Sequence, residues 1–271
     1  MAIFDALLDK IARLVTGVVE SQVSGYEPYT PSDPKTLKAT LQPGDILLVE
    51  GNQKLSAAIK YLTQSTWSHA AIYIGEILEP DASGERLCLV EADVRNGVIA
   101  VPLSKYETFN TRICRPVNLT DKDCEAVINY ILSRIGDQYD TRNVFDLLRY
   151  LIPTPPIPVR WRRRMLALGS GDPTRAICST MIAKAFQKIY YPILPLVSSH
   201  DDPSPRVRSY YSQQEILHIR HHSLFTPRDF DVSPFFRIIK PTIESGFNYK
   251  GLIWGEETAA DGQLNSDPPA V

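Results

Sequence analysis

The sequence has no apolar run that approaches the roughly 20 residues a membrane-spanning helix requires. Residues 1–21 are rich in apolar side chains, but Asp5, Asp9, Lys10 and Arg13 interrupt them, which is not expected of an ordinary secretory signal. An excess of one charge sign is also lacking, because the net charge of −2 provides no overall attraction to nucleic acid or acidic membranes. We therefore expect an intracellular, cytoplasmic protein without a nucleic-acid partner.

Cysteine is scarce and scattered. The four cysteines are Cys88, Cys114, Cys124 and Cys178, and no two of them form a CxxC pair. Their spacing implies no disulfide framework, so we expect reduced thiols. Internal repeats are absent too, and the remaining composition, 44% apolar and 22% charged, is that of an ordinary globular protein.

The first half of the chain predicts a twisted antiparallel sheet of adjacent strands. Short apolar runs bounded by turn residues indicate strands. These runs cover residues 45–49, 69–74, 86–92, 97–103 and 111–117, with a short helix over 52–64 between the first two. Residues 22–40 are polar and contain proline, which favours a connector.

The second half is mainly helical. Thr120 or Asp121 caps a helix that ends before Gly136, and residues 137–151 form a second helical stretch. A strong helix starts between Pro173 and Ile177. The remaining predicted segments are a loop over 191–212, a helix start at 226–229, a strand over 234–240 and a polar, disordered tail. The fold class is therefore α+β.

Residues 2–20 predict an amphipathic helix, because their apolar side chains repeat at helical spacing. The simpler interpretation is that this helix packs on the domain. The alternative is a helix that contacts a membrane surface or a partner, although acids on its polar face weaken the case for lipid.

The stretch "TWSHAAIYIG" begins a predicted strand with a histidine, His69. The hairpin that follows is centred near residue 80, so directly opposed residues have numbers that add to about 160. His69 and Glu91 meet this condition, which predicts Cβ atoms roughly 5 Å apart on one face of the sheet. A carboxylate there can accept the imidazole N–H, fix the tautomer and favour the protonated ring, as a general base requires.

A nucleophile is available in "ICSTMIAKAF". Cys178 lies early in this predicted helix, where unpaired N–H groups and the helix dipole favour a thiolate. Each of the three residues also has an ordinary structural explanation: a buried cysteine, a structural histidine and a solvated glutamate. Sequence order alone does not bring them together.

Six segments occur together in one order: "LQPGDILLVEG", "STWSHAAIYIG", "LVEADVRNGVIAVPLSKY", "GDQYD", "ICSTMIAKAF" and "LFTPRDFDVSPFFRII". In this order they resemble the permuted papain-like hydrolases of the YiiX/YaeF type, which are circularly permuted relatives of NlpC-type cysteine peptidases. The resemblance implies a permuted papain-like fold, with an antiparallel sheet packed against helices that include the cysteine helix. It also implies a cysteine hydrolase, and we expect no cofactor and no metal.

Carried over one at a time, the catalytic residues of the family fall on His69, Glu91 and Cys178, with Glu76 and Asp93 as rivals to Glu91. The resemblance implies that an amide or ester of a small acyl, peptide or lipid substrate passes through a thioester on the cysteine. The backbone N–H of the cysteine is the first candidate for stabilising the oxyanion. Candidate cleft residues are Trp67, Ser68, Tyr73, Tyr139, Asp140 and Ser179.

Two long segments depart from the family pattern. We expect residues 1–40 to hold the N-terminal helix and connector, 41–255 the hydrolase domain, and 256–271 the tail. The domain carries insertions at about 150–172 and 191–222, and both are predicted to flank the cleft.

Two further clusters carry alternative interpretations. Trp161 lies among Arg160, Arg162, Arg163 and Arg164, which is typical of a solvated loop or of a contact with lipid head groups or another anionic ligand at the membrane periphery. In "HIRHH", a helix would place His218, His221 and His222 on one side, near Glu215. The simpler prediction there is that no metal binds.

Two alternative functions remain open. An acyltransferase would use the same thioester with an alcohol or amine in place of water, as in lecithin:retinol acyltransferase-like proteins. A non-catalytic module would bind lipid or protein through the N-terminal helix and the arginine cluster. This second alternative predicts that Cys178 is buried or distant from His69.

Overall fold

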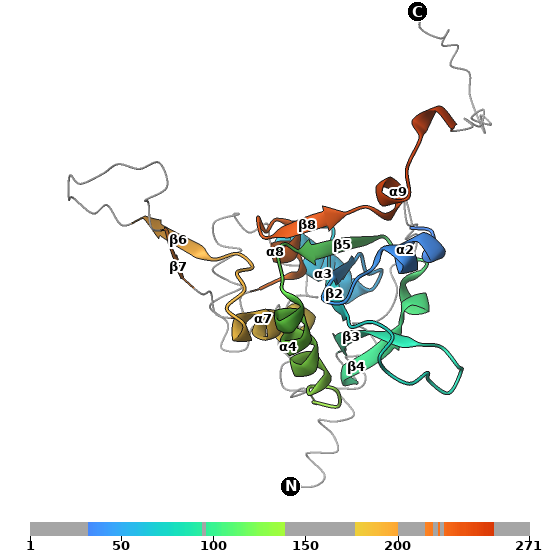
Figure 1. The fold of residues 1–271 in the computed structure, drawn as a ribbon, viewed down its shortest axis with the longest axis horizontal. Coiled ribbons are helices and arrows are strands. Elements are labelled where there is room, and N and C mark those ends of the chain that lie inside the picture. The colour runs from blue at the N-terminus through green and yellow to red at the C-terminus, as the bar shows by residue number, and fades with distance from the viewer. Residues whose placement is uncertain are drawn as a thin grey trace, which may run out of the picture.

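The structure is a computed structural model, drawn in Figure 1. It describes residues 32–93, 96–138, 177–199, 215–218, 222 and 225–251. The predicted N-terminal helix over 2–20 and the predicted tail over 256–271 lie outside the described residues.

A six-stranded antiparallel sheet forms the centre of the fold, in the order β4-β3-β2-β1-β5-β8. The strands are β1 (Ile46–Val49), β2 (His69–Tyr73), β3 (Leu87–Asp93), β4 (Gly97–Pro102), β5 (Thr111–Pro116) and β8 (Phe236–Ile239). Helices pack against this sheet. The predicted α+β class is confirmed.

Helix α4 (Asp121–Leu132) begins at a recognisable capping residue. Thr120 caps α4 by accepting a hydrogen bond from the Asp123 N–H, as predicted for this position. The helices are α2 (Pro34–Thr40), α3 (Lys54–Thr63), α4 (Asp121–Leu132), α7 (Ile177–Lys188), α8 (Pro227–Asp231) and α9 (Pro241–Glu244). Two 3-10 turns, η1 (Leu103–Tyr106) and η3 (Tyr249–Gly251), complete the described helical elements.

The sheet buries apolar side chains on both faces. On one face, Ala70 and Ile72 pack against α4 and α7, for example against Ile131 and Ile182. On the other face, Ala71 and Leu89 belong to a second core with residues of α2 and η1. Figure 1 shows α4 and α7 side by side on their face of the sheet. Because β1 is apolar at every position, all four of its residues are buried.

The strand order differs from the prediction at β5. The first four strands are neighbours, as the sequence predicts, but β5 pairs with β1 and not with β4. Residues 103–110, which include η1, carry the chain from β4 at the sheet edge to the far side of β1. This crossing is important for the site, because it brings η1 over the second core.

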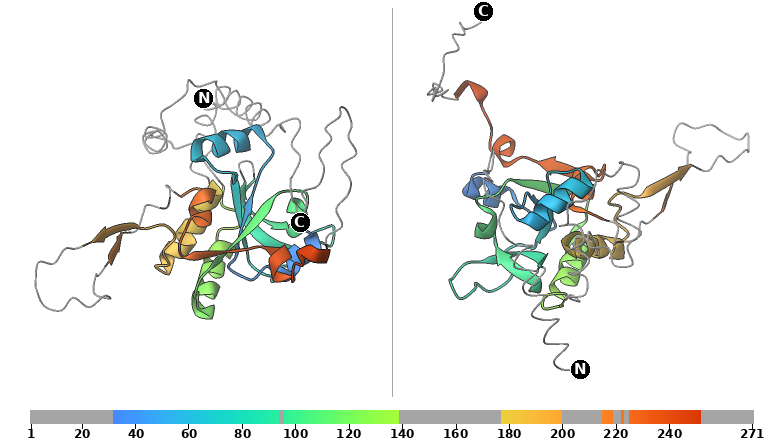
Figure 2. Two further views of the ribbon diagram at one scale, coloured as in Figure 1. Left: turned by 90° about the horizontal axis from the view of Figure 1, so that it is seen from above. Right: turned by 180° about the vertical axis from the view of Figure 1, so that it is seen from behind.

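Two segments predicted to lack regular structure contain elements. Within the predicted connector over 22–40, Asp33 caps α2 with its side chain and Pro34 occupies the first helical position. Within the predicted loop over 191–212, β6 (Leu196–Ser199) pairs with β7 (Glu215–His218) in a two-stranded ladder. Figure 2 shows this ladder projecting away from the central sheet.

The predicted hairpin register is wrong by two residues. Ile72 lies opposite Val90 and Tyr73 opposite Leu89, so Glu91 is diagonal to His69 and not directly across from it. The connection contains a local turn in which the Asp81 side chain accepts hydrogen bonds from Ser83 and Glu85. This turn shifts the centre of the hairpin along the chain. A shift by an even number keeps both side chains on the same face.

Candidate active site

His69 and Glu91 contact each other directly. Nε2 of His69 lies 3.1 Å from Oε2 of Glu91. Glu91 lies in the middle of β3 and is 1% exposed, whereas the His69 side chain, at the first position of β2, is 25% exposed. Because Nε2 faces the carboxylate, Nδ1 is the ring nitrogen left for another partner.

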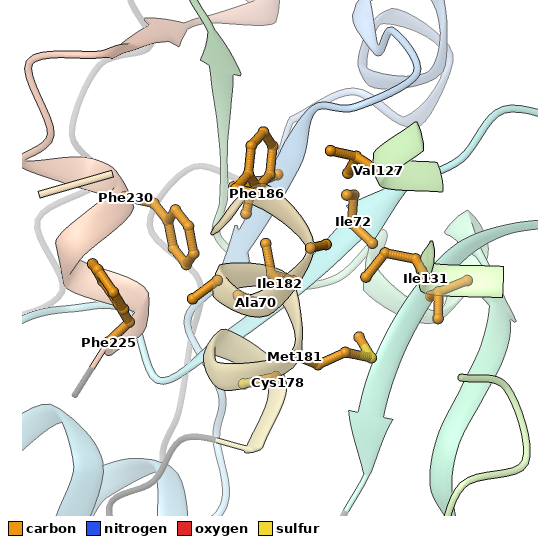
Figure 3. Close-up of a cluster of buried hydrophobic side chains, with 14 of the residues drawn as sticks. Ala70, Ile72, Val127, Ile131, Cys178, Met181, Ile182, Phe186, Phe225 and Phe230 are labelled. Atoms are coloured by element: carbon orange, nitrogen blue, oxygen red, sulfur yellow. The ribbon is translucent and has the colours of Figure 1, made fainter. Parts of the chain in front are cut away.

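Cys178, the second residue of α7, is another neighbour of His69. Helix α7 packs against β2 and β3, which brings the late helix to the early sheet. The Cys178 thiol lies close enough to the His69 side chain and to the backbone N–H of Ala70 for both groups to lower its pKa. Its Sγ lies 4.0 Å from the Ser179 hydroxyl. Figure 3 shows Cys178 at the start of its helix, beside Met181 and the core. Cys178 is 4% exposed and in contact with His69.

The charges of these groups support one another. Burial opposes the thiolate, but the positive charge of His69 and its hydrogen bond outweigh this and lower the pKa of Cys178. Burial also opposes the imidazolium, yet the negative charges of Cys178 and Glu91 raise the pKa of His69 to about 10. This environment favours a thiolate–imidazolium pair at neutral pH.

Glu91 has two further donors that the sequence interpretation missed. Lys105 donates from Nζ to Oε1 of Glu91, and Tyr106 donates its hydroxyl hydrogen to Oε2. Both residues lie in η1, which sequence periodicity does not reveal because the turn is only four residues long. Burial raises the pKa of Glu91, but His69 and Lys105 outweigh it and lower this pKa to about 2.

The segment that leads into His69 is fixed by partly buried polar contacts. The Trp67 indole N–H donates to Oδ2 of Asp231 at 3.1 Å, and Arg112 donates to Oδ1 at 2.7 Å. The Arg112 guanidinium lies 4.9 Å from the Trp67 ring centroid. Ser68 accepts the backbone N–H of Gly51 at 2.9 Å. These contacts tie α8, β5 and the start of β2 together.

The remaining predicted cleft residues have different positions. Tyr73 is buried in the second core, four residues along β2 from His69. Ser179 is fully buried beside Cys178. Predictions for Tyr139, Asp140 and the cluster at 160–164 fall outside the described residues.

The two rival carboxylates have other partners. Glu76 forms an ion pair with Lys38 at 2.6 Å, beyond the far end of β2. Asp93 accepts hydrogen bonds from the backbone and side chain of Asn96, in the turn after β3. The carboxylate that contacts His69 is therefore Glu91.

The histidine cluster does not form on a helix as considered from the sequence. His218 ends strand β7, and His221 is outside the described residues. Across the described ranges, no group of three His, Cys, Asp or Glu side chains is arranged to hold a metal ion. Within the same ranges, no helix combines the length and the apolar character needed to cross a membrane.

Comparison with known proteins agrees with the resemblance to permuted papain-like proteins. Residues 40–149 match the model of the family described as "Permuted papain-like amidase enzyme, YaeF/YiiX, C92 family". This match confirms the resemblance predicted from the sequence, and it supports a cysteine hydrolase in the broad sense. The matched segment contains His69 and Glu91, whereas Cys178 lies beyond it.

Among solved structures, the chain is similar to the one titled crystal structure of metalloprotein yiiX from Escherichia coli O157:H7. The two are 15% identical, with a TM-score of 0.42, and the similarity covers 73% of this chain and 96% of that one. No curated protein matches the chain.

Proposed function

We propose that the protein is a thiol hydrolase that cleaves an amide or ester bond through Cys178, His69 and Glu91. The observation that carries this proposal is the position of His69, whose ring contacts the Glu91 carboxylate at 3.1 Å and lies near enough to the Cys178 thiol to lower its pKa. A nucleophile, a base and a group that orients the base are the parts that covalent acyl transfer needs. The amidase description of the matched family supports the same reaction class.

In the first half of the reaction, the Cys178 thiolate attacks the acyl carbonyl carbon. A C–S bond forms and the C=O electron pair moves to oxygen. The backbone N–H of Cys178 is the first candidate for stabilising this oxyanion. When the tetrahedral intermediate collapses, the C–N or C–O bond breaks. The His69 imidazolium donates its proton to the leaving amine or alkoxide, and an acyl thioester remains on Cys178.

In the second half, neutral His69 removes a proton from water, and the resulting hydroxide attacks the thioester carbon. The C–S bond then breaks and releases a carboxylic acid, while the thiolate–imidazolium pair is restored. Throughout, Glu91 holds Nε2 and stabilises the positive charge on the ring. The substrate class that we infer is a peptide-like amide or a lipid-linked acyl ester.

The experiment is to trap the acyl group. The full chain is mixed with a panel of p-nitrophenyl esters of short and long fatty acids and of N-acyl dipeptide anilides, then quenched and analysed by mass spectrometry. We expect an acyl adduct on the Cys178 peptide that is absent in Cys178→Ala and much reduced in His69→Ala. A panel that acylates wild type and Cys178→Ala equally would contradict the proposal.

The same reactions distinguish hydrolysis from acyl transfer. With a primary alcohol or amine added, a hydrolase still releases mainly the free acid, whereas a transferase releases the acylated acceptor. We expect the free acid. Acylated acceptor as the main product, still dependent on Cys178, would assign the acyltransferase alternative.

A further inference from the structure

The second core holds a cluster built around the buried carboxylate of Glu91. Its Oε2 accepts from Nε2 of His69 and from the hydroxyl of Tyr106, and its Oε1 accepts from Nζ of Lys105. Lys105 is the most exposed of these residues, with a side chain that is 39% exposed against 25% for His69. Each oxygen of the carboxylate therefore has a donor, and the donors come from β2 and from η1.

Charge balance gives Lys105 a role that packing alone does not. An isolated buried carboxylate tends to take up a proton, because burial disfavours its charged form. With Cys178 and Glu91 negative and His69 and Lys105 positive, the four charges sum to zero. Without Lys105 the remaining three charges sum to −1, and the pKa of Glu91 is expected to rise because Lys105 is one of the two cations that lower it. Once protonated, Glu91 would no longer offer His69 a negatively charged acceptor.

Tyr106 fixes the direction of the carboxylate. Its hydroxyl contacts the same oxygen that faces His69, and its ring centroid lies 6.1 Å from the His69 ring. Phe109 packs edge-on against the Tyr106 ring at 5.9 Å, and Tyr106 is 5% exposed. Burial and the negative charge of Glu91 raise the pKa of Tyr106, so it remains a hydrogen donor at neutral pH.

We propose that Lys105 and Tyr106 are positioning residues that keep Glu91 ionised and hold its Oε2 against His69. This inference deepens the proposed function and rests on it, because the orientation of His69 matters only if His69 moves protons. The titratable groups that face Glu91 are His69 from β2 and Lys105 and Tyr106 from η1. Cys178 from α7 adds a negative charge near His69 and Tyr106. Asp93 of β3 adds a like charge near Tyr106.

The test observes the His69–Glu91 hydrogen bond without any substrate. In the full chain with labelled histidine, NMR detects the Nε2 proton of His69. A hydrogen bond to a carboxylate shifts this resonance far downfield, and its disappearance in Glu91→Gln assigns it. Wild type should keep this resonance on acidification until the protein unfolds. Lys105→Met and Tyr106→Phe should lose the resonance at a pH that is roughly one unit or more above the pH at which wild type loses it. At that pH, near-ultraviolet circular dichroism should still report a folded protein.

Matched controls separate positioning from general stability. Tyr191→Phe removes a tyrosine hydroxyl that donates to Val117 O and Phe235 O, and Lys60→Met removes a partly buried ion pair with Glu50 at 3.0 Å. Both should lower the melting temperature without moving the pH at which the His69 resonance disappears. Lys105→Arg, which keeps the charge, should restore the wild-type behaviour.

Loss of the resonance at the same pH in wild type, Lys105→Met and Tyr106→Phe would overturn the inference, even if both variants melt earlier. The result is independent of acyl trapping at Cys178. If trapping fails while the resonance behaves as described, the proposed function is wrong, but Lys105 and Tyr106 still keep the Glu91 carboxylate ionised and in place. If trapping succeeds and the resonance does not respond, only the present inference is wrong.

Discussion

Two buried cysteines occupy contrasting regions of this molecule. Cys114 lies inside the sheet on β5 and is fully buried, and Cys178 begins α7 and is 4% exposed. Burial raises the pKa of Cys114, and the nearby negative charge of Asp231 raises it further. Burial acts in the same direction on Cys178, but the His69 imidazolium reverses the outcome and lowers its pKa. The comparison shows that the neighbouring charge, and not the degree of burial, distinguishes the two thiols.

The largest effect should come from exchanging the two thiols for hydroxyls. Cys178→Ser should fold and should abolish turnover of the ester or amide that acylates the wild type, because a serine hydroxyl beside His69 is a far weaker nucleophile than a thiolate. Cys114→Ser should place a hydroxyl in an apolar core, cost about 1–3 kcal/mol of stability and leave turnover per folded molecule unchanged. Steady-state rates and urea denaturation of both variants provide the measurement. Equal turnover by Cys178→Ser and wild type would show that the Cys178 thiol is no more important for activity than the Cys114 thiol, which would contradict the proposed function.

A smaller effect is expected at the carboxylate. Glu91→Gln keeps the size of the side chain but removes the negative charge that stabilises the His69 imidazolium. We expect turnover to fall by about tenfold or more, since 1.4 kcal/mol corresponds to a factor of ten. Asp93→Asn is the matched control from the same strand, and its rate should stay close to wild type. If Glu91→Gln keeps the wild-type rate and Asp93→Asn does not, then Asp93, and not Glu91, is the carboxylate that supports His69.

The smallest effect is a pH-dependent difference in stability. The pKa of Glu91 is lowered to about 2 in the folded protein, from an ordinary value of 4.5, so its contribution is present above pH 4.5 and is lost as the pH falls toward 2. The pKa of His69 is raised to about 10 from 6.5, so its contribution is present below pH 6.5 and is lost as the pH rises through 10.

Urea denaturation across this range can measure both contributions. The free energy of unfolding lost in Glu91→Gln should shrink on acidification, and that lost in His69→Ala should shrink at alkaline pH. Losses that stay constant with pH would show that the two side chains act by packing alone.

The sequence predicts part of this site through periodicity. His69 and Glu91 share a face because their positions keep the same parity, and this survives the two-residue error in register. By contrast, no periodicity relates Cys178 to His69, because the contact depends on how α7 packs against β2. That contact could be anticipated only from the resemblance to a family.

Residues outside regular patterns were the hardest to anticipate. Lys105 and Tyr106 contact Glu91 from a 3-10 turn that lies in the crossing between β4 and β5, and the predicted strand order had no such crossing. The α2 helix had local signals in Asp33 and Pro34, but its polar composition favoured a connector. In both cases tertiary packing decides the structure, and short elements depend on it most.

The most direct measurement of the central claim is the rate at which iodoacetamide alkylates each cysteine of the full chain at neutral pH. Peptide mass spectrometry resolves the four sites, and Cys124, which is more exposed than Cys178, gives the rate of an unactivated thiol. We predict that Cys178 reacts faster than Cys124 and Cys114 in wild type, and that His69→Ala removes this advantage. Reaction at Cys178 no faster than at Cys124, with no change in His69→Ala, would contradict the account.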